Sequence, residues 1–496
     1  MSLHNRREFL RDSSLLAAAS LSLGQLSHAQ DDKKKKEKEK KVVAKVSANE
    51  RIRVAIIGFN GRGMDHIKGF GSMPETEIVM LCDPDQRIVE KGMKGVKELQ
   101  EKEPGYVQDL RRIMDDKSID AVSIATPNHW HALAAIWAIQ AGKDVYVEKP
   151  VSHNVSEGRR IVEVARKNNK IVQTGTQSRS NEGMQQVMEF LHAGKIGAVK
   201  VAYGLCYKPR GSIGVTTSPY AVPEKFDYNL WCGPAPMDPV MRSGIHYNWH
   251  WFWNTGNGDL GNQGIHEMDK ARWGLNLKTM PDNVWSMGGR VGYVDSAETA
   301  NTQLCIFNYA KEGCRLFFEV RGLKTDDYKG AKVGNIWVGP DGYVVSNSYS
   351  AGIAYRPNGE KIVEFKGGGN HYANFVKAVK SRKHTDLNAD IEEGHLSSAL
   401  CHLGNISYRL GHIASPEELT KTMDSPKSLG MCDEGCDAVA RMKKHLEDNK
   451  ADLTGKFHIG KPLQLDAANE CFKDDKAANA MLTREYRKGF EVPAKA

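Results

Sequence analysis

The feature that most constrains the fold is an aliphatic segment that ends at a glycine-rich turn near residue 58. Residues 52–57 are aliphatic except for Arg53, which is typical of a strand buried on both faces of a parallel sheet. The segment is followed by Gly58, Phe59, Asn60, Gly61, Arg62 and Gly63, and then by a helical pattern. Such a turn lets the backbone approach a pyrophosphate and directs the N-terminus of the next helix toward it. The segment predicts a dinucleotide-binding unit, although Asn60 stands where the usual spacing has its second glycine.

Further strands and helices alternate after this turn. We expect strands over residues 77–82, 121–125, 144–147 and 170–174, with helices over 86–101, 130–141 and 155–168. This alternation predicts a doubly wound parallel sheet in an NAD(P)-binding domain at residues 50–175, with ligands at the carboxyl ends of the strands. The expected cofactor-binding residues there are Thr126, Asn128, His131, Glu148 and Lys149, and Gln177 is expected to border the nicotinamide.

An acidic residue follows the second predicted strand and bears on the choice of cofactor. Asp83 is placed to bind the adenine ribose hydroxyls, which favours NAD over NADP. The alternative is that Asp83 is a turn residue before Pro84. Arg87 is a candidate to pair with a 2′-phosphate, so NADP stays open.

Lys149 is the first candidate catalytic residue. It follows a strand beside Glu148, where burial and neighbouring charges can tune its pKa. A lysine there can hydrogen-bond the nicotinamide ribose and the substrate hydroxyl. The alternative is a solvated surface lysine.

The chain resembles the glucose-fructose oxidoreductase, inositol dehydrogenase and rhizopine-catabolism (Gfo/Idh/MocA) family. The resemblance rests on the residues above, on Pro127, Asn128 and His129, and on a later Gly264, Ile265, His266 and Asp269. The resemblance covers roughly residues 51–409, and Glu148-Lys149-Pro150 is its most specific element. It implies an α/β fold in which the Rossmann domain is followed by an α+β domain at 176–415, built on a large open, mostly antiparallel sheet. A sugar-like substrate would lie between the two domains, and the open sheet face resembles the family's dimer or tetramer surface. Residues 401–409 and the N-terminal leader resemble the exported branch of the family.

His266 is the second candidate catalytic residue, as general base or hydrogen-bond donor to the reacting hydroxyl. In dehydrogenases of the family, an Asp four residues before this His completes the catalytic set, but here that residue is Asn262. Asp259 and Asp269 are candidates for the missing carboxylate, and Asp269 is alternatively structural. A structural role is also the alternative for His266.

An aromatic cluster at residues 245–254 is the candidate carbohydrate platform, because aromatic faces stack on sugars. Trp249 and His250 are its expected substrate residues, together with Asn262 and His266. The alternative is an aromatic core, since three Trp in five positions cannot all face one groove. Weaker substrate candidates are Arg179, Tyr203, Lys208 and Arg210.

The N-terminal segment is expected to be a targeting signal and not part of the fold. Arg6 and Arg7 precede an apolar stretch at 15–26 and small residues up to Ala29, which resembles a twin-arginine signal at residues 1–29. A charged linker follows at 30–49. The alternative is a cytoplasmic chain with an accidental arginine pair. We expect export to the periplasm through the twin-arginine machinery, with no permanent membrane span.

The net charge of +8 does not indicate nucleic-acid binding. The leader contributes +1 and the lysine-rich run at 31–41 contributes +3, which leaves +4 for the rest of the chain. The nine cysteines have no zinc-site spacing, so we expect no metal. Residues 416–496 are expected to form a helical C-terminal extension.

The sequence therefore predicts an exported oxidoreductase that transfers hydride between a tightly bound NAD, with NADP as the alternative, and a hydroxyl of a sugar, cyclitol or glycoside. Tight binding is expected because the periplasm has no free nicotinamide pool. An NAD-dependent glycosidase, which oxidises the sugar only transiently, is the alternative. A non-catalytic sugar-binding protein is the third class, and a homo-oligomer is expected.

Overall fold

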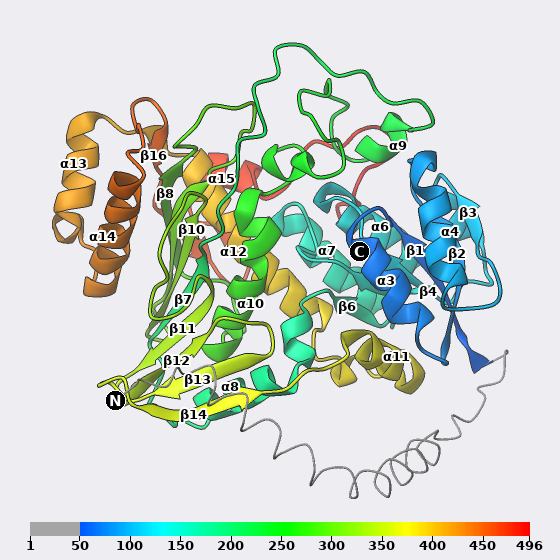
Figure 1. Cartoon of the computed structure of the whole chain (residues 1–496), viewed down its shortest axis with the longest axis horizontal. Coiled ribbons are helices and arrows are strands. Elements are labelled where there is room, and N and C mark those ends of the chain that lie inside the picture. Colours follow the sequence, from blue (N-terminus) through cyan, green and yellow to red (C-terminus); the bar gives the residue numbers. More distant parts are fainter. Residues whose placement is uncertain (1–49) are drawn as a thin grey trace, which may run out of the picture. The chain divides into compact units, whose positions relative to one another are not determined.

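The computed structural model describes residues 50–496, and its first part is a parallel sheet with helices on both faces (Figure 1). Within these residues the first sheet has six strands in the order β3-β2-β1-β4-β5-β6, all parallel. The strands are β1 (Ile52–Ile57), β2 (Thr76–Cys82), β3 (Gly105–Val107), β4 (Ala121–Ile124), β5 (Asp144–Val147) and β6 (Val172–Thr174). Strand β3 was not predicted, because it has only three residues.

Helices connect these strands. They are α3 (Arg62–Gly71), η2 (Gln86–Ile88), α4 (Val89–Lys97), α5 (Arg111–Asp115), α6 (Asn128–Gln140) and α7 (Val155–Lys167). The helix expected over residues 86–101 is therefore the shorter α4, preceded by one 3-10 turn.

The aliphatic character of β1 follows from its position between two layers of helices. Ala55 and Ile57 pack into a cluster with α6 and α7 on one face of the sheet. Val54 and Ile56 pack with α3, α4 and α11 (His371–Ser381) on the other face. Alternate side chains of a strand point to opposite faces, so a strand covered on both sides must be apolar throughout.

The second part of the fold is a large mixed sheet. Within residues 50–496 it contains twelve strands, with the path β14-β13-β12-β11-β7-β10-β9-β8-β16-β15 and with β17 and β18 beside it. Their pairings are antiparallel except for the parallel pair β7 and β10. The predicted fold class, a Rossmann sheet followed by a mostly antiparallel sheet domain, is confirmed.

The strands of this sheet are β7 (Val201–Cys206), β8 (Asn283–Gly289), β9 (Thr302–Tyr309), β10 (Cys314–Arg321), β11 (Val333–Gly339), β12 (Gly342–Ser346), β13 (Ala351–Tyr355), β14 (Lys361–Lys366), β15 (His412–Ile413), β16 (Phe457–Ile459), β17 (Leu463–Asp466) and β18 (Cys471–Phe472). The helices of this part are η3 (Gln177–Ser180), α8 (Glu182–His192), α9 (Tyr228–Cys232), η4 (Asn248–Trp251), η5 (Leu260–Gly264), α10 (Ile265–Gly274), η6 (His384–Asp386), α12 (Ile391–Arg409), α13 (Pro416–Asp424), η7 (Pro426–Leu429), α14 (Asp433–Asp448) and α15 (Lys476–Ala480).

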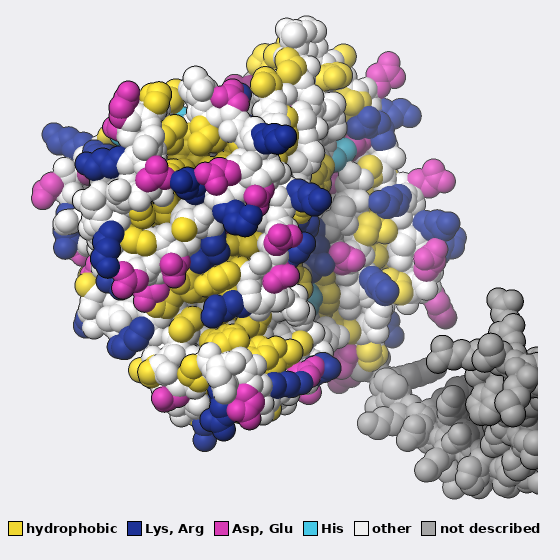
Figure 2. Space-filling view, turned by 60° about the vertical axis from the view of Figure 1, so that its left-hand side comes forward, with side chains coloured by type: hydrophobic (Ala, Val, Ile, Leu, Met, Phe, Trp, Pro, Cys, Tyr) yellow, Lys and Arg dark blue, Asp and Glu magenta, His cyan; other side chains and the backbone are white. Residues whose placement is uncertain are grey.

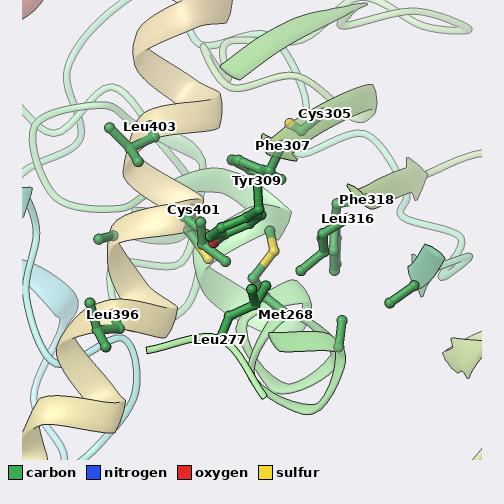
Figure 3. Packing of buried hydrophobic residues seen from close by; sticks show 14 of the residues in the cluster. Met268, Leu277, Cys305, Phe307, Tyr309, Leu316, Phe318, Leu396, Cys401 and Leu403 are labelled. Carbon is green, nitrogen blue, oxygen red and sulfur yellow. The ribbon is translucent and has the colours of Figure 1, made fainter. Parts of the chain in front are cut away.

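Helices α8, α10 and α12 cover the inner face of the large sheet. Figure 3 shows the core that they form there, with Met268 of α10 and Cys401 of α12 beside Phe307 and Tyr309 of β9. Helix α12 also packs against α7 of the first domain. A hydrogen bond of 3.1 Å from the Val151 amide to the Ser398 hydroxyl supports this contact, so one helix fixes the two parts to each other.

The C-terminal segment packs against both parts of the fold and corrects the expectation that it is only helical. Helix α14 packs over β9 and β10, where its Met442 joins Phe317 in a buried cluster on the outer sheet face. This face of the sheet is therefore partly covered by the chain itself. In addition, residues 416–496 are not only helical, because β16 and β17 add to the sheet at β8. The final residues return to the first domain, where Phe490 packs on Trp130.

Figure 2 shows the molecule from the side of the large sheet. On this face Lys and Arg side chains are interspersed with Asp and Glu side chains, and hydrophobic side chains lie between them. The predicted signal at 1–29 and the linker at 30–49 lie outside the described residues. None of the helices in residues 50–496 is long and apolar enough to cross a membrane.

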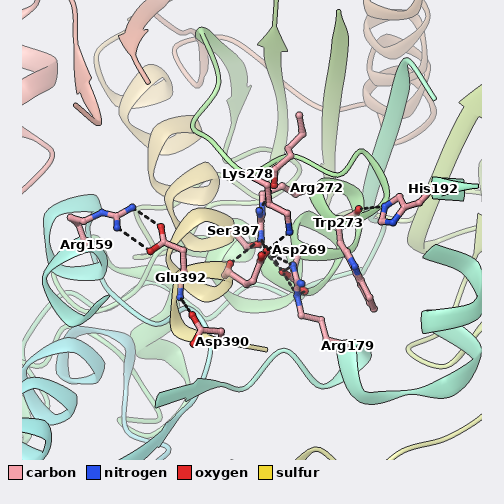
Figure 4. Close-up of polar contacts among 12 residues, drawn as sticks. Arg159, Arg179, His192, Asp269, Arg272, Trp273, Lys278, Asp390, Glu392 and Ser397 are labelled. Carbon is pink, nitrogen blue, oxygen red and sulfur yellow. Dashed lines mark hydrogen bonds and ion pairs between the residues drawn. The ribbon is translucent and has the colours of Figure 1, made fainter. Parts of the chain in front are cut away.

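A buried charge network joins η3, α10 and α12 (Figure 4). The Arg179 guanidinium donates to the Asp269 carboxylate at 2.8–3.0 Å and to Glu393 at 3.0 Å. Asp269 also accepts a hydrogen bond of 2.7 Å from Ser397. The side chains of Arg179 and Asp269 are only 4% and 1% exposed. Each charge therefore depends on the other for compensation, because water cannot reach either.

We predict that Asp269→Ala strongly destabilises the protein, by about 3–5 kcal/mol, because it leaves the Arg179 charge buried without its main partner. The matched control is Lys278→Ala. Lys278 pairs with the same Glu393 but is 60% exposed, so its loss costs less than about 1 kcal/mol. Thermal unfolding followed by circular dichroism compares the two variants. Equal melting temperatures for both would contradict the assigned role of the network.

Candidate active site

A cleft of about 530 Å³ lies at the carboxyl ends of the first sheet's strands, and its size is in the range of small-molecule sites. It brings together most of the residues that the sequence analysis singled out. The predicted residues that line it are Gly58, Phe59, Asn60, Gly61, Arg62, Asp83, Thr126, Asn128, His131, Glu148, Lys149, Gln177, Trp249, His250, Asn262 and His266.

The glycine turn is shaped by two close approaches. Gly58 has a φ of +79°, and a Cβ there would lie 2.9 Å from the backbone of Ala125. A Cβ on Gly63 would lie 1.9 Å from the Gly58 carbonyl oxygen, so Gly63 packs behind the turn and does not line the cleft. Gly61 has open space around its Cα. The turn therefore requires glycine at positions 58 and 63 but accepts Asn60 between them.

Asp83 faces the cleft next to this turn. Its carboxylate accepts hydrogen bonds from the amides of Phe59 at 3.2 Å and Asp85 at 3.0 Å. Burial nevertheless raises the pKa of Asp83 to about 6. Arg87 does not line the cleft, because its guanidinium is held by the Asp85 carboxylate at 2.7–2.8 Å. The Asp83 carboxylate thus lies in the cleft, whereas the Arg87 guanidinium is bound to Asp85 outside it.

Glu148 is a buried carboxylate that organises the base of the cleft. Its Oε1 accepts from Arg62 Nε at 2.9 Å and lies 3.1 Å from His66 Nε2. Its Oε2 accepts from the Lys149 amide at 3.2 Å. Burial opposes ionisation, but the His66 hydrogen bond and the Arg62 charge hold the pKa of Glu148 well below its usual value. Glu148 therefore remains charged and positions its neighbours.

Lys149 is half-buried, not a solvated surface lysine. Its Nζ donates to the backbone oxygen of Asn262 at 2.6 Å, and this bond joins β5 to η5, a short π-helix. Burial lowers the pKa of Lys149, although the charges of Glu148 and Glu267 oppose the shift. The peptide bond from Lys149 to Pro150 is cis. The amino group thus lies at the cleft wall with a tuned pKa.

His266 faces the same cleft from α10. Its ring lies 4.8 Å from the ring of Tyr349, and its Nδ1 is buried without a hydrogen-bond partner in the described part of the chain. Burial and the nearby Lys149 charge lower the pKa of His266 well below its usual value. The imidazole is therefore neutral at pH 7 and able to accept a proton.

Neither predicted aspartate supplies the carboxylate missing at Asn262. Asp259 is paired with Arg210 at 2.6 Å, and Asp269 belongs to the Arg179 network. The buried acid nearest in sequence to His266 is Glu267, which lies 3.9 Å from Lys270 Nζ. Burial raises the pKa of Glu267 to about 7. Glu267 was not among the predicted site residues, because it matches no motif position.

Tyr349 is a further cleft residue that the sequence analysis missed. It lies in the loop between β12 and β13, and its hydroxyl accepts from Gln263 Nε2 at 3.0 Å. Burial raises the pKa of Tyr349 to about 12, so the hydroxyl stays protonated. The loop carries no motif that could have indicated it.

The aromatic cluster contributes only in part. Trp249 and His250 line the cleft, and their rings stack at 3.6 Å. Trp251 is buried, and Trp253 lines a different cavity.

His131 lies between the carbonyl oxygens of Thr126 and Pro150, at 2.7 and 2.6 Å, and so joins the two cleft loops.

Four weaker substrate candidates lie outside the cleft lining. Arg179 is bound within its ion-pair network. Tyr203 lies on the outer face of the large sheet, where it stacks on Phe317 at 5.3 Å, because the strand alternation of β7 turns it away. Arg210 is held by Asp259, and Lys208 donates to Gln263 at 3.2 Å.

Three buried polar atoms of cleft residues have no partner in residues 50–496: Thr126 Oγ1, Gln177 Oε1 and His266 Nδ1. Buried polar atoms are normally hydrogen-bonded, so these atoms indicate a polar ligand. With the glycine turn and Asp83, they fit a dinucleotide. The described residues contain no cluster of three or more His, Cys, Asp or Glu side chains placed to hold a metal ion.

Comparison with known families agrees with this geometry. Residues 52–176 match the model described as "Oxidoreductase family, NAD-binding Rossmann fold", and residues 197–429 match its "C-terminal alpha/beta domain". The chain belongs to the Gfo/Idh/MocA oxidoreductase family.

Curated relatives match this chain over a segment about as long as one domain. A "Glycosyl hydrolase family 109 protein" of Shewanella pealeana is 33% identical over 172 residues, which is 34% of this chain and 38% of the relative. An "Alpha-N-acetylgalactosaminidase" of Shewanella oneidensis is 28% identical over 177 residues, 34% of this chain and 39% of the relative. The chain thus matches less than half the length of these relatives.

Solved structures share the fold. The WlbA dehydrogenase from Bordetella pertussis, in complex with NADH and UDP-GlcNAcA, has a TM-score of 0.52 at 18% sequence identity. The match covers 72% of this chain and 97% of the WlbA chain. The WlbA dehydrogenase from Chromobacterium violaceum, with the same ligands, has a TM-score of 0.54 at 18% sequence identity. The match covers 74% of this chain and 96% of that WlbA chain.

We predict that NAD affinity falls as the pH drops from about 7 to about 5, because protonation of Asp83 removes an acceptor for the ribose hydroxyls. Asp83→Asn should weaken NAD binding about tenfold at neutral pH and flatten this pH dependence. Fluorescence titration with NADH measures both effects. Asp115→Asn, an exposed acid of the same domain, is the control and should behave as wild type. An unchanged pH profile in Asp83→Asn would contradict the role of Asp83.

Proposed function

We propose that this protein is an NAD-dependent oxidoreductase that acts on a hydroxyl of a sugar, cyclitol or glycoside. The observation that carries the proposal is the placement of a half-buried lysine and a neutral buried histidine, Lys149 and His266, in one cleft beside the dinucleotide turn. The bound nicotinamide supplies a hydride acceptor or donor.

The residues of the chain manage the proton of that reaction. Lys149 Nζ is placed to donate hydrogen bonds to the nicotinamide ribose and to the substrate hydroxyl. A ring nitrogen of His266 takes the hydroxyl proton as the carbon loses its hydride. Trp249 offers an apolar ring at the cleft wall for the face of a sugar, and Tyr349 and Asn262 offer polar edges.

Three further properties belong to the proposal. NAD is preferred over NADP, because Asp83 faces the cleft and would repel a 2′-phosphate while Arg87 is engaged by Asp85. The cofactor is tightly bound and stays with the protein during export through the twin-arginine machinery to the periplasm. The protein forms a homo-oligomer, and size-exclusion chromatography with light scattering measures that state.

A second candidate is an NAD-dependent glycosidase, which oxidises the sugar transiently, removes the acidified α-proton, eliminates the aglycone, adds water and returns the hydride. The names of the Shewanella relatives favour it. So does Asn262, because loss of the family carboxylate alters the proton relay beside His266. In this reaction the protonated Tyr349 hydroxyl is an additional proton donor within the cleft.

The two reactions differ in net redox change. Pure protein is incubated with aryl glycosides, including α-N-acetylgalactosaminides, without added NAD. Release of aglycone without net NADH formation supports the glycosidase, whereas sugar oxidation that depends on added NAD or a second sugar supports the oxidoreductase. Protein that releases no nicotinamide nucleotide on denaturation would count against tight binding.

We predict that Lys149→Met lowers turnover by about 10²–10⁴-fold, because the amino group that hydrogen-bonds the reacting hydroxyl is lost. Substrate turnover is compared with that of Lys94→Met, in which an exposed lysine of the same domain is replaced. NADH fluorescence verifies that the cofactor site of each variant is intact. Unchanged turnover in Lys149→Met would refute the catalytic assignment.

A further inference from the structure

A second cavity, of about 190 Å³, lies outside the cofactor cleft. Its walls come from four separate stretches of chain: the start of α7, the segment after η4, the end of α12 and the residues that follow α15. The last of these is part of the C-terminal extension. This cavity therefore forms only when residues 480–484 return to the first domain.

Two arginines of this cavity have no carboxylate partner. Arg484 donates to the backbone oxygen of Asn254 at 3.0 Å and to His153 Nδ1 at 3.1 Å, both of which are neutral acceptors. Arg409 lies over the ring of Trp253, with its guanidinium carbon 4.9 Å from the ring centre. Neither arginine forms an ion pair within residues 50–496. Arg484 is half-buried and Arg409 is exposed, and both line this one cavity without a paired carboxylate.

The histidines of the cavity add donors but no negative charge. Because His153 Nδ1 accepts from Arg484, the proton of the neutral ring is on Nε2, which is buried and has no partner in the described part of the chain. His402 is 3% exposed, and its Nδ1 likewise has no partner there. Burial lowers the pKa of both rings, and the nearby arginine charge lowers that of His153 further. Both histidines are thus neutral at pH 7.

The acids near the cavity are already engaged. Glu298 accepts from the Trp253 amide at 2.7 Å. Glu157 accepts from the His153 amide at 2.7 Å and from the Asn154 amide group at 2.9 Å. The charge of Glu298 acts on Arg409, and that of Glu157 on Arg484, only at longer range than an ion pair. The cavity therefore presents guanidinium, imidazole and amide donors to its interior without a carboxylate in its lining.

We propose that this cavity is a binding site for a small oxyanion, either a free ion or a sulfate, phosphate or carboxylate group carried by a carbohydrate. Arginine forks bind such oxygen pairs with two parallel hydrogen bonds. The His153 Nε2–H group supplies a further donor. The cavity is smaller than a typical site for a drug-sized ligand, so it suits one charged group.

The site is distinct from the cofactor cleft but adjoins it. Asn257 lines the second cavity, and its amide group donates to the His153 carbonyl oxygen at 3.1 Å. Its Oδ1 accepts from Asn128 at 2.9 Å, and Asn128 lines the cofactor cleft. One asparagine thus separates the two sites. The proposal does not depend on which reaction the cleft performs.

The test measures anion binding to the full chain by isothermal titration calorimetry with sulfate, phosphate, acetate, glucuronate and galactose 6-sulfate. We expect at least one of these anions to bind, and Arg484→Gln to weaken it by about tenfold or more. Arg409→Gln is a second, independent variant. The matched control is Lys488→Gln, which removes one exposed positive charge from the same segment outside the cavity and should bind as wild type.

The outcomes separate the sources of the anion and the two sites. Equal binding of sulfate and galactose 6-sulfate supports a free ion, whereas binding of only the sugar-borne anions supports a substituted carbohydrate. NADH binding to each variant, measured by fluorescence, reports on the cofactor cleft independently and verifies folding. Absence of binding by all five anions, or equal affinity in wild type and the Arg409→Gln/Arg484→Gln double variant, would overturn the proposal.

Discussion

The buried carboxylate of Glu148 is the charge on which the cofactor cleft depends. A carboxylate in a protein interior is stable only when donors surround it. Here those donors come from Arg62 and His66 on α3 and from the Lys149 amide. The interaction fixes the helix that follows the glycine turn against the end of β5. As a result, the glycine turn and Lys149, the candidate catalytic lysine, have one relative position.

The second domain completes this arrangement by limiting water. Asn262 and His266 come from η5 and α10, and the backbone oxygen of Asn262 accepts from Lys149 Nζ. Helix α10 is itself held by Asp269 in the network with Arg179 and α12. A lysine and a histidine with lowered pKa values therefore meet in one cleft because separate buried ion pairs hold their elements. The desolvation that tunes these groups is a property of the packed interface, not of either residue type.

The C-terminal segment covers surfaces of both domains. Helix α14 covers part of the outer face of the large sheet, and β16 and β17 extend that sheet at β8. The last residues then return to the first domain, where Phe490 contacts Trp130 and Arg484 contacts His153. One extension thus protects apolar sheet surface and also builds a second polar cavity.

The sequence by itself determined the fold class, five of the six strands of the first sheet and most of the residues of the cleft. These could be predicted because local periodicity and glycine spacing report directly on buried strands and tight turns. Only the tertiary structure decided the rest. Arg179 and Tyr203 are ordinary polar and aromatic residues in the sequence, and it is long-range pairing with Asp269 and packing on Phe317 that remove them from the site. Tyr349, Glu267 and Arg484 gain their roles from residues far away in the chain or from burial, neither of which leaves a local pattern, because desolvation and charge compensation exist only once distant segments have packed together.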